Sequence, residues 1–261
     1  MDNGDQGKAM LKGEYNSMCA LYKAAPTFVP EPHAYGQLNV SNPASYFFLC
    51  SFLDMKVGTS QPPDPEQLCR KLITLHLTSE SPTGQFGFHM NTCQGNLPQQ
   101  TAWKDSWKDS WKDFFIQLLN GAMELNRDIN GPWKDLQECT DRLISHVVPA
   151  LLDPLTEDGR VIKPSLIHGD LWDGNIGTDT ATGEIYAFDA CAYYAHHEME
   201  IAIWRGDPSN VLGREEYTNT YVQLMGKSEP VKDFEDRGRL YCAYMNLHAS
   251  ACHGGGRFRE K

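Results

Sequence analysis

The first twenty-four residues carry apolar side chains at the spacing of an amphipathic helix, which predicts a helix over 8–24. The residues of this apolar stripe are Met10, Leu11, Met18, Leu21 and Tyr22. Prolines follow at positions 26, 30 and 32. Because proline cannot continue a helix, the element is expected to end before them.

Two short apolar runs follow, over 34–38 and 46–52, and both predict β-strands. The second run, YFFLCSF, lacks an alternating polar face, so we expect a buried central strand. The next segment, LDMKVGTSQPPDP at 53–65, is polar and contains glycine and prolines, which is typical of a linker or hinge.

Helical periodicity dominates the rest of the chain. Strand-like runs return around 166–189, where SLIHGD and EIYAFDA are separated by a Gly-rich loop and a TATGE turn. This pattern predicts a hairpin-like β unit set among helices. The predicted helices are 65–78, 104–126, 133–152, 198–205, 214–225 and 232–252.

A tandem repeat, WKDSWKDSWKDFF, lies at the start of the predicted helix 104–126. Trp103, Trp107 and Trp111 are four residues apart, so on a helix each is offset by only ~40° from the last. The stripe is either an aromatic wall beside a substrate cleft or a core-facing face lengthened by duplication, and tryptophans at this spacing usually face a core. Two surface pairs are expected at i,i+3: Asp105–Lys108 and Asp109–Lys112.

The charge of the chain excludes some partners. Its 261 residues include 34 acidic and 23 basic side chains, a formal net charge of −11 at pH 7. This excess argues against a nucleic-acid backbone or an anionic membrane as partner. A phosphorylated small molecule remains compatible, because bound Mg²⁺ reverses the local sign.

Neither a membrane span nor a secretion signal is predicted. No apolar run approaches the ~20 residues of a membrane helix, and MDNGDQGKAM lacks the apolar region of a signal peptide. The eight cysteines form no CxxC pair and no zinc spacing, which is typical of reduced thiols in a cytoplasmic protein.

The stretch HGDLWDGNIG at 168–177 has a composition that suits phosphoryl transfer. That reaction needs a carboxylate to orient the attacking hydroxyl and oxygen ligands to hold Mg²⁺. Asp170 and Asn175 have the spacing of base and metal ligand in the protein-kinase loop HRDxxxxN, and Asp189 ends the strand-like EIYAF. Each alone fits a turn or cap, but together they favour a kinase site. His168 is interpreted as a buried scaffold residue rather than a proton shuttle.

Several separate segments resemble one family. LIHGDLWDGNIG and IYAFDACAYYAHHEMEIAI are similar to the fructosamine (ketoamine) 3-kinase family, protein-ribulosamine 3-kinase-like and of fungal type, within the aminoglycoside phosphotransferase and choline kinase superfamily. GEYNSMCALY resembles its Glu-bearing helix and FFLCSFLDM its last N-lobe strand and hinge. LHLTSESPTGQFGFHMNTCQGNLPQ and LYCAYMNLHASACHGGGRF resemble its Phe-Gly-Phe segment and its C-terminal helix. The resemblance extends over most of 8–258.

The resemblance implies an α+β, protein-kinase-like (aminoglycoside phosphotransferase-like) two-lobe fold. Residues 1–55 would form a truncated N-lobe with the Glu-bearing helix, two strands and the hinge, and 56–261 a mainly helical C-lobe with the catalytic loop. Asp170 would be the catalytic base, and Asn175 and Asp189 the ligands of Mg²⁺. The residues implied in ATP binding are Glu14, Ser51, Phe52, Leu53 and Asp54.

The same resemblance implies the acceptor, which is the 3-hydroxyl of a ribulosamine or fructosamine adduct on a protein lysine or on a small ketoamine. The implied role is ATP-dependent repair of glycated protein. Trp172 and His196 are implied at the substrate. His196, Glu198 and Glu200 match the segment after the metal-binding Asp, and HHExE lacks the HExxH spacing of a zinc site.

The N-terminus departs from the family pattern. Only seven residues precede the predicted helix, so a Gly-containing loop and a strand lysine that would pair with Glu14 are expected to be missing. Lys8 and Lys12 belong to the helix itself, and 46–49 are then expected at an unpaired sheet edge. Ala190 also stands where the family has proline.

Two alternative functions stay open. One is a catalytically impaired, kinase-like binding protein without the nucleotide clamp. The other is a different acceptor within the superfamily, such as choline or an aminoglycoside, and both Trp172 and the FGF segment argue against it. The sequence makes no prediction about oligomeric state.

Overall fold

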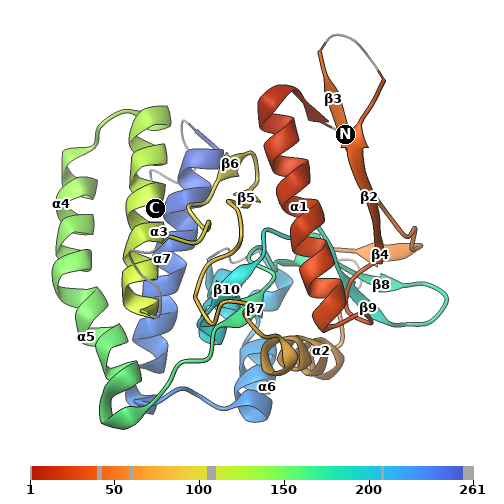
Figure 1. Ribbon diagram of the computed structural model, residues 1–261. Helices are drawn as coiled ribbons and strands as arrows, with labels where there is room; N and C mark the ends of the chain where they lie inside the picture. Colours follow the sequence, from red (N-terminus) through yellow and green to blue (C-terminus); the bar gives the residue numbers. More distant parts are fainter. Residues whose placement is uncertain (1, 40–42, 59–61, 105–109, 207–208, 255–261) are drawn as a thin grey trace.

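The structure is a computed structural model that describes residues 2–39, 43–58, 62–104, 110–206 and 209–254. Helices, strands and short 3-10 turns alternate along the chain, and most of the helices follow residue 64 (Figure 1). The α-helices are α1 (Gly4–Ala24), α2 (Pro65–Thr78), α3 (Trp111–Asn130), α4 (Lys134–Arg142), α5 (Val148–Leu152), α6 (Glu215–Met225) and α7 (Phe234–Cys252). The strands are β1 (Asp2–Asn3), β2 (Pro32–Gln37), β3 (Ser45–Cys50), β4 (Met55–Val57), β5 (Cys93–Gln94), β6 (Leu97–Pro98), β7 (Ser165–Ile167), β8 (Ile176–Asp179), β9 (Ile185–Ala187) and β10 (Tyr193–Ala195).

The N-terminal unit is one helix packed on a small antiparallel sheet. The strands lie in the order β1-β3-β2, so β3 is central as predicted, and the sheet has three strands where two were expected. The expectation that this strand is buried is wrong. α1 packs on the sheet, but Leu49 of β3 remains 53% exposed. β1 pairs with Ser45 and Tyr46, so the predicted open edge at 46–49 already has a partner at Tyr46.

The predicted linker at 53–65 contains a strand. β4 pairs antiparallel with β8, which pairs in turn with β9, so the sheet order is β4-β8-β9. The expectation of an irregular segment is therefore wrong at Met55–Val57. Local composition could not reveal this strand, because its partner lies more than a hundred residues away. The predicted boundary between the two lobes, after residue 55, therefore falls inside β4.

Most predicted helices are confirmed. α2 begins after Asp64, whose side chain accepts the backbone N–H of Gln67, and Pro65 occupies the first turn, where its missing N–H costs nothing. α4 continues through a π-helical turn, η1 (Leu143–Val147), into α5, which accounts for the predicted helix 133–152. The segment predicted as a helix at 198–205 is the 3-10 helix η4 (His197–Arg205). The other short 3-10 helices are η2 (Asp153–Gly159), η3 (Asp173–Asn175), η5 (Val211–Gly213) and η6 (Val231–Asp233).

The tryptophan repeat does not form one helical stripe. α3 begins only at Trp111, after Ser110, whose hydroxyl accepts the backbone N–H of Asp113. Trp103 lies ahead of the helix, where its backbone N–H bonds Phe88. Trp111 is buried and its indole N–H donates to the hydroxyl of Tyr241, which confirms the core interpretation for that residue. Trp107 and both predicted Asp–Lys pairs involve residues outside the described ranges.

The predicted β unit around 166–189 is confirmed in part. β8 and β9 form the hairpin through the TATGE turn. The preceding strand, β7, pairs with β10 instead of with β9. The loop between β7 and β8 therefore starts in one small sheet and ends in another, which fixes both of its ends.

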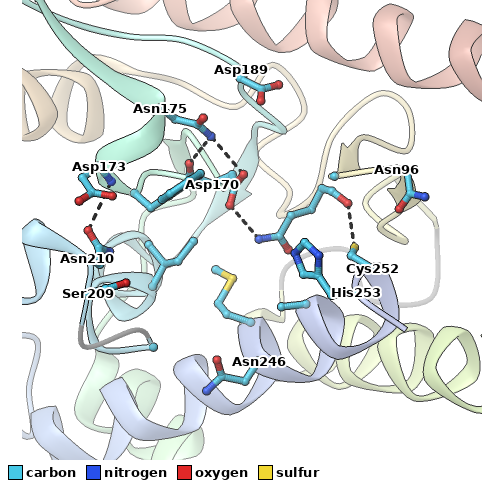
Figure 2. Close-up of a pocket in the computed structure, with 17 residues that line it drawn as sticks. Asn96, Asp170, Asp173, Asn175, Asp189, Ser209, Asn210, Asn246, Cys252 and His253 are labelled. Carbon is cyan, nitrogen blue, oxygen red and sulfur yellow. Dashed lines mark hydrogen bonds between the residues drawn. The ribbon is translucent and has the colours of Figure 1, made fainter. Parts of the chain in front are cut away.

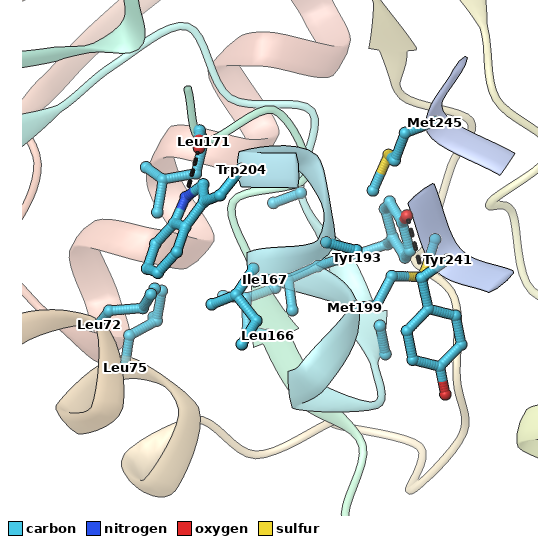
Figure 3. Close-up of a cluster of buried hydrophobic side chains, with 14 of the residues drawn as sticks. Leu72, Leu75, Leu166, Ile167, Leu171, Tyr193, Met199, Trp204, Tyr241 and Met245 are labelled. Atoms are coloured by element: carbon cyan, nitrogen blue, oxygen red, sulfur yellow. Dashed lines mark hydrogen bonds between the residues drawn. The ribbon is translucent and has the colours of Figure 1, made fainter. Parts of the chain in front are cut away.

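The hydrophobic core surrounds β7. Leu166 and Ile167 of β7 lie in the middle of this core (Figure 3). Leu72, Leu75 and Trp204 lie on one side of them, and Tyr241 lies on the other. The indole N–H of Trp204 donates to the backbone oxygen of Leu171, which draws the loop after β7 into the core (Figure 3). No helix in the described part of the chain is both long enough and apolar enough to cross a membrane.

A buried ion pair joins η4 to α7. Arg237 and Glu198 lie 2.8 Å apart, and their side chains are only 0% and 2% exposed. Arg237 also donates to the backbone oxygens of Ser228 and Pro230. A buried carboxylate of this kind is tolerated only because its oxygens are occupied by donors.

We expect Glu198→Gln to lower the free energy of unfolding by about 3–5 kcal/mol, because it leaves Arg237 buried without its anion. Chemical denaturation followed by circular dichroism measures this change. Glu66→Gln is the control, because Glu66 pairs with Arg70 at the surface, where a loss of less than ~1 kcal/mol is expected. Equal losses in the two variants would contradict the prediction.

Candidate active site

The backbone of the loop at 168–175 is held by a buried glutamate. The backbone N–H groups of His168 and Gly169 both donate to the carboxylate of Glu200, which is 1% exposed. Gly169 has φ +86°, and a Cβ there would meet the backbone oxygen of Cys191 at 2.6 Å. Only glycine fits this backbone conformation and this close approach.

His168 is a scaffold residue, in agreement with the interpretation from the sequence. Its Nδ1 accepts the backbone N–H of Asp170, so its Nε2 carries the proton that bonds the oxygen of Phe188, 3.1 Å away. Burial lowers the pKa of the ring, which favours the neutral form that this arrangement requires. The ring therefore ties the start of the loop to the strand end that precedes Asp189.

Asp170 lies at the centre of a cleft, with both carboxylate oxygens occupied by amide donors (Figure 2). Gln94 Nε2 donates to Oδ1 at 3.0 Å, and Asn175 Nδ2 donates to Oδ2 at 3.1 Å. Burial raises the pKa of Asp170 to about 6, the Gln94 hydrogen bond opposes this shift, and the Asp189 charge adds to it. The carboxylate is thus fixed in place and able to act near neutral pH.

Asn175 and Asp189 present oxygen atoms to the same side of the cleft (Figure 2). Asn175 uses its amide nitrogen for Asp170, which leaves Oδ1 available as a ligand. Asp189 is exposed, has φ +61° and has no hydrogen bond or ion pair to the part of the chain that the structure describes. A non-glycine residue in the left-handed region is strained, which is common at functional sites.

These donors fit Mg²⁺ in the presence of a phosphorylated ligand. Mg²⁺ prefers carboxylate and amide oxygens and usually takes its remaining ligands from phosphate and water. Within the described ranges, no group of three His, Cys, Asp or Glu side chains has the arrangement of a closed metal site. Asn175 and Asp189 would therefore hold Mg²⁺ together with phosphate oxygens.

The cleft has a volume of about 620 Å³ and a mixed lining. Four predicted site residues line it: Asp170, Trp172, Asn175 and Asp189. Trp172 is 44% exposed. The lining also contains residues that were not among the predicted site residues. Gln94 ends β5, Ile203 belongs to η4, Asn210 precedes η5, and Met245, Asn246 and Ala249 lie on α7.

Six predicted site residues lie outside this lining: Glu14, His196 and the four hinge residues 51–54. Glu14 does not line the cleft, but burial and then the nearby charge of Asp189 raise its pKa to about 7, so the two carboxylates approach each other. His196 is buried, and its ring bonds the hydroxyls of Tyr241 and Ser228. It can act on the cleft only as a support.

The predicted hinge, 51–54, adjoins β4. The N–H of Ser51 bonds Glu31, and Asp54 is bonded through its backbone oxygen and its carboxylate to Thr180 in the β8–β9 turn. Between them, the backbone groups of Phe52 and Leu53 have no hydrogen-bond partner among the described residues. Peptide groups of this kind are available to a planar heterocycle such as adenine.

Comparisons with known proteins agree with these observations. The family model for fructosamine kinase matches residues 2–261. The chain is 31% identical over 255 residues to the chloroplastic protein-ribulosamine 3-kinase of Oryza sativa subsp. japonica, covering 97% of this chain and 67% of that protein. It is 29% identical over 266 residues to the ketosamine-3-kinase of Mus musculus, covering 93% and 78%.

Solved structures share the fold. A protein from Haemophilus somnus 129PT assigned as a fructosamine-3-kinase superposes with a TM-score of 0.71 at 19% identity, covering 99% of this chain and 78% of that one. A thermostable mutant of aminoglycoside phosphotransferase APH(4)-Ia, in ternary complex with AMP-PNP and hygromycin B, superposes with a TM-score of 0.55 at 17% identity, covering 93% and 76%. The fold is therefore the protein-kinase-like fold that was expected.

Glu14→Gln is expected to stabilise the ligand-free protein at pH 8 and to leave it unchanged near pH 4. A carboxyl whose folded pKa is raised from 4.5 to about 7 contributes stability below pH 4.5 and loses it as the pH rises through 7. The gain at pH 8 should be about 1–3 kcal/mol, reduced by partial exposure. Thermal unfolding at both pH values tests this, with the exposed Glu157→Gln as control. A gain of the same size at both pH values would rule out the charge of Glu14 as its source.

Proposed function

The chain belongs to the fructosamine kinase family, and we propose that it transfers the terminal phosphate of ATP to the 3-hydroxyl of ketoamines. The proposed acceptors are ribulosamine and fructosamine adducts on protein lysines, or the corresponding small ketoamines. The names of the rice and mouse relatives support this acceptor class. The proposed role is repair of glycated protein.

The observation that carries the proposal is the geometry of Asp170. Each oxygen of an ionised carboxylate has two acceptor positions, and the amide donors of Gln94 and Asn175 occupy only one on each. An acceptor hydroxyl in the cleft would therefore donate to a remaining position. Asp170 would orient that hydroxyl and take its proton as the new bond to phosphorus forms.

The nucleotide would lie between the hinge and the catalytic loop. Adenine would bond the backbone groups of Phe52 and Leu53. The complex of an aminoglycoside phosphotransferase of this fold with AMP-PNP supports the use of a nucleotide. Asn175 Oδ1 and Asp189 would hold Mg²⁺ beside the phosphates. When bound, Mg²⁺ neutralises charge on the transferred phosphate. Glu14 lies near Asp189, where it would add negative charge beside the metal.

The acceptor would lie between Trp172 and the apolar side chains of η4 and α7. Ile203, Met245 and Ala249 line this side of the cleft. An open-chain sugar offers its C–H face to an indole, and the aliphatic part of a lysine suits apolar side chains. This apolar side of the cleft supports a ketoamine acceptor.

Asp170→Asn is expected to lower kcat for phosphate transfer by ~10²–10⁴-fold with nucleotide affinity nearly unchanged, because the amide cannot accept the proton. Transfer of radiolabelled phosphate from ATP to a peptide with a ribulosyl- or fructosyl-lysine measures kcat. Retained transfer in Asp170→Asn would exclude the assigned role.

The same assay separates the alternatives. Choline and hygromycin B serve as acceptor controls, and transfer to either in place of the ketoamine would assign a different acceptor. Binding of the glycated peptide without transfer by the unmodified chain would support a kinase-like binding protein instead.

Gly174→Ala is expected to raise KM for the ketoamine by roughly tenfold, with kcat less affected. A Cβ at Gly174 would overlap the six-membered ring of Trp172, so the indole would have to leave its position in the cleft. Initial rates at varied peptide concentration measure the change. Gly183→Ala is the control, because no atom lies within 4 Å of a Cβ built there, although its φ of +73° costs some stability. An unchanged KM in Gly174→Ala would exclude Trp172 as an acceptor contact.

A further inference from the structure

Gln94 contacts the centre of the site from a segment outside the kinase motif. It ends β5, and its amide nitrogen lies 3.0 Å from Asp170 Oδ1, although 76 positions separate the two residues in sequence. The residue is 8% exposed. Its amide oxygen is buried and has no hydrogen-bond partner in the described part of the chain.

That unsatisfied oxygen indicates which end of the amide is needed. Burying an amide oxygen without a donor destabilises a fold, so an apolar side chain of the same size would suit the site better if it served packing alone. Exchange of the two amide ends would place an oxygen against the carboxylate of Asp170, which is repulsive. The orientation with nitrogen toward Asp170 is therefore the one that the surroundings impose.

The backbone around Gln94 is fixed on both sides. Before it, the hydroxyl of Thr92 donates to the oxygen of Cys191, two residues after Asp189. After it, the thiol of Cys252 on α7 donates to the backbone oxygen of Gln94. The amide donor is thus carried on a hairpin anchored both to the metal-side loop and to the last helix.

Asp170 needs a second donor because its carboxylate turns easily. The torsion about the Cβ–Cγ bond of aspartate is broad and roughly two-fold. Asn175 contacts only Oδ2. With that single contact the carboxylate plane can rotate, whereas donors on both oxygens define the plane and the direction of the remaining lone pairs.

We propose that Gln94 is a positioning residue for phosphate transfer, one that sets the carboxylate plane of Asp170 by donating to Oδ1. The inference rests on the proposed function for its kinetic readout only. Gln94 contacts no proposed metal ligand, so its effect is on the orientation of the base and leaves nucleotide binding intact.

The test is a double-mutant cycle with Gln94→Met and Asp170→Asn. Gln94→Met keeps the length of the side chain and removes the donor. We expect kcat to fall by roughly ten- to a hundredfold with both KM values nearly unchanged, since misorientation of a reacting group costs this much. In the Asp170→Asn background the same change should lower the residual rate by less than about twofold, because the two residues act as one unit.

Gln99→Met is the matched control. Gln99 is 1% exposed, follows the same hairpin and also has an unpartnered buried amide atom, but its amide oxygen accepts from the hydroxyl of Tyr244. The Gln99→Met variant should have a lower melting temperature and an unchanged kcat. Gln94→Leu, which also removes the donor, replaces Gln94→Met if the latter does not fold.

Two kinetic outcomes overturn the proposal: kcat of the Gln94 variants within about twofold of the unmodified enzyme, or losses that simply add to that of Asp170→Asn. A crystal structure of the Gln94 variant gives a readout independent of activity. If the unmodified chain transfers no phosphate to ketoamines, the proposed function fails. The crystal structure of the Gln94 variant still tests whether Gln94 orients Asp170. A rotated Asp170 carboxylate supports the inference, and an unchanged plane overturns it.

Discussion

The catalytic loop depends on one buried carboxylate. Glu200 accepts the successive N–H groups of His168 and Gly169, and these donors offset the large cost of removing the charge from water. One helical turn later, Trp204 donates to the oxygen of Leu171. The short helix η4 therefore holds the backbone on both sides of Asp170, so the proposed base has a fixed position before any ligand binds.

The site itself was largely predictable from sequence because its chemistry is local. Asp170, Trp172 and Asn175 lie within one short loop, and the β8–β9 hairpin returns Asp189 to it. Such a loop must supply particular residue types at particular positions, and those positions are visible in the chain. Gln94 was not named as a site residue. Its segment resembles the family as a whole, but nothing local shows that this glutamine reaches Asp170, 76 positions away.

The fold predictions failed where a tertiary partner decided the structure. β4 forms because β8 pairs with it, and the composition of its own segment is that of a linker. The tryptophan repeat suggested an early start for α3, but the Ser110 cap sets the first turn at Trp111. α2 was predicted to the residue, because Asp64 and Pro65 mark its start within the sequence itself.

The carboxylates around the cleft divide into two groups. Asp170 and Glu200 have amide or backbone donors, and so does Asp173, whose side chain accepts the N–H of Val211. Glu14 and Asp189 have no donor among the described residues, although the charge of Asp189 raises the pKa of Glu14. The first group is held in place by N–H donors of the protein and needs no ligand to stay there. Of the second group, Asp189 lines the cleft, so the proposed Mg²⁺ would arrive with phosphate where the described part of the chain supplies no donor.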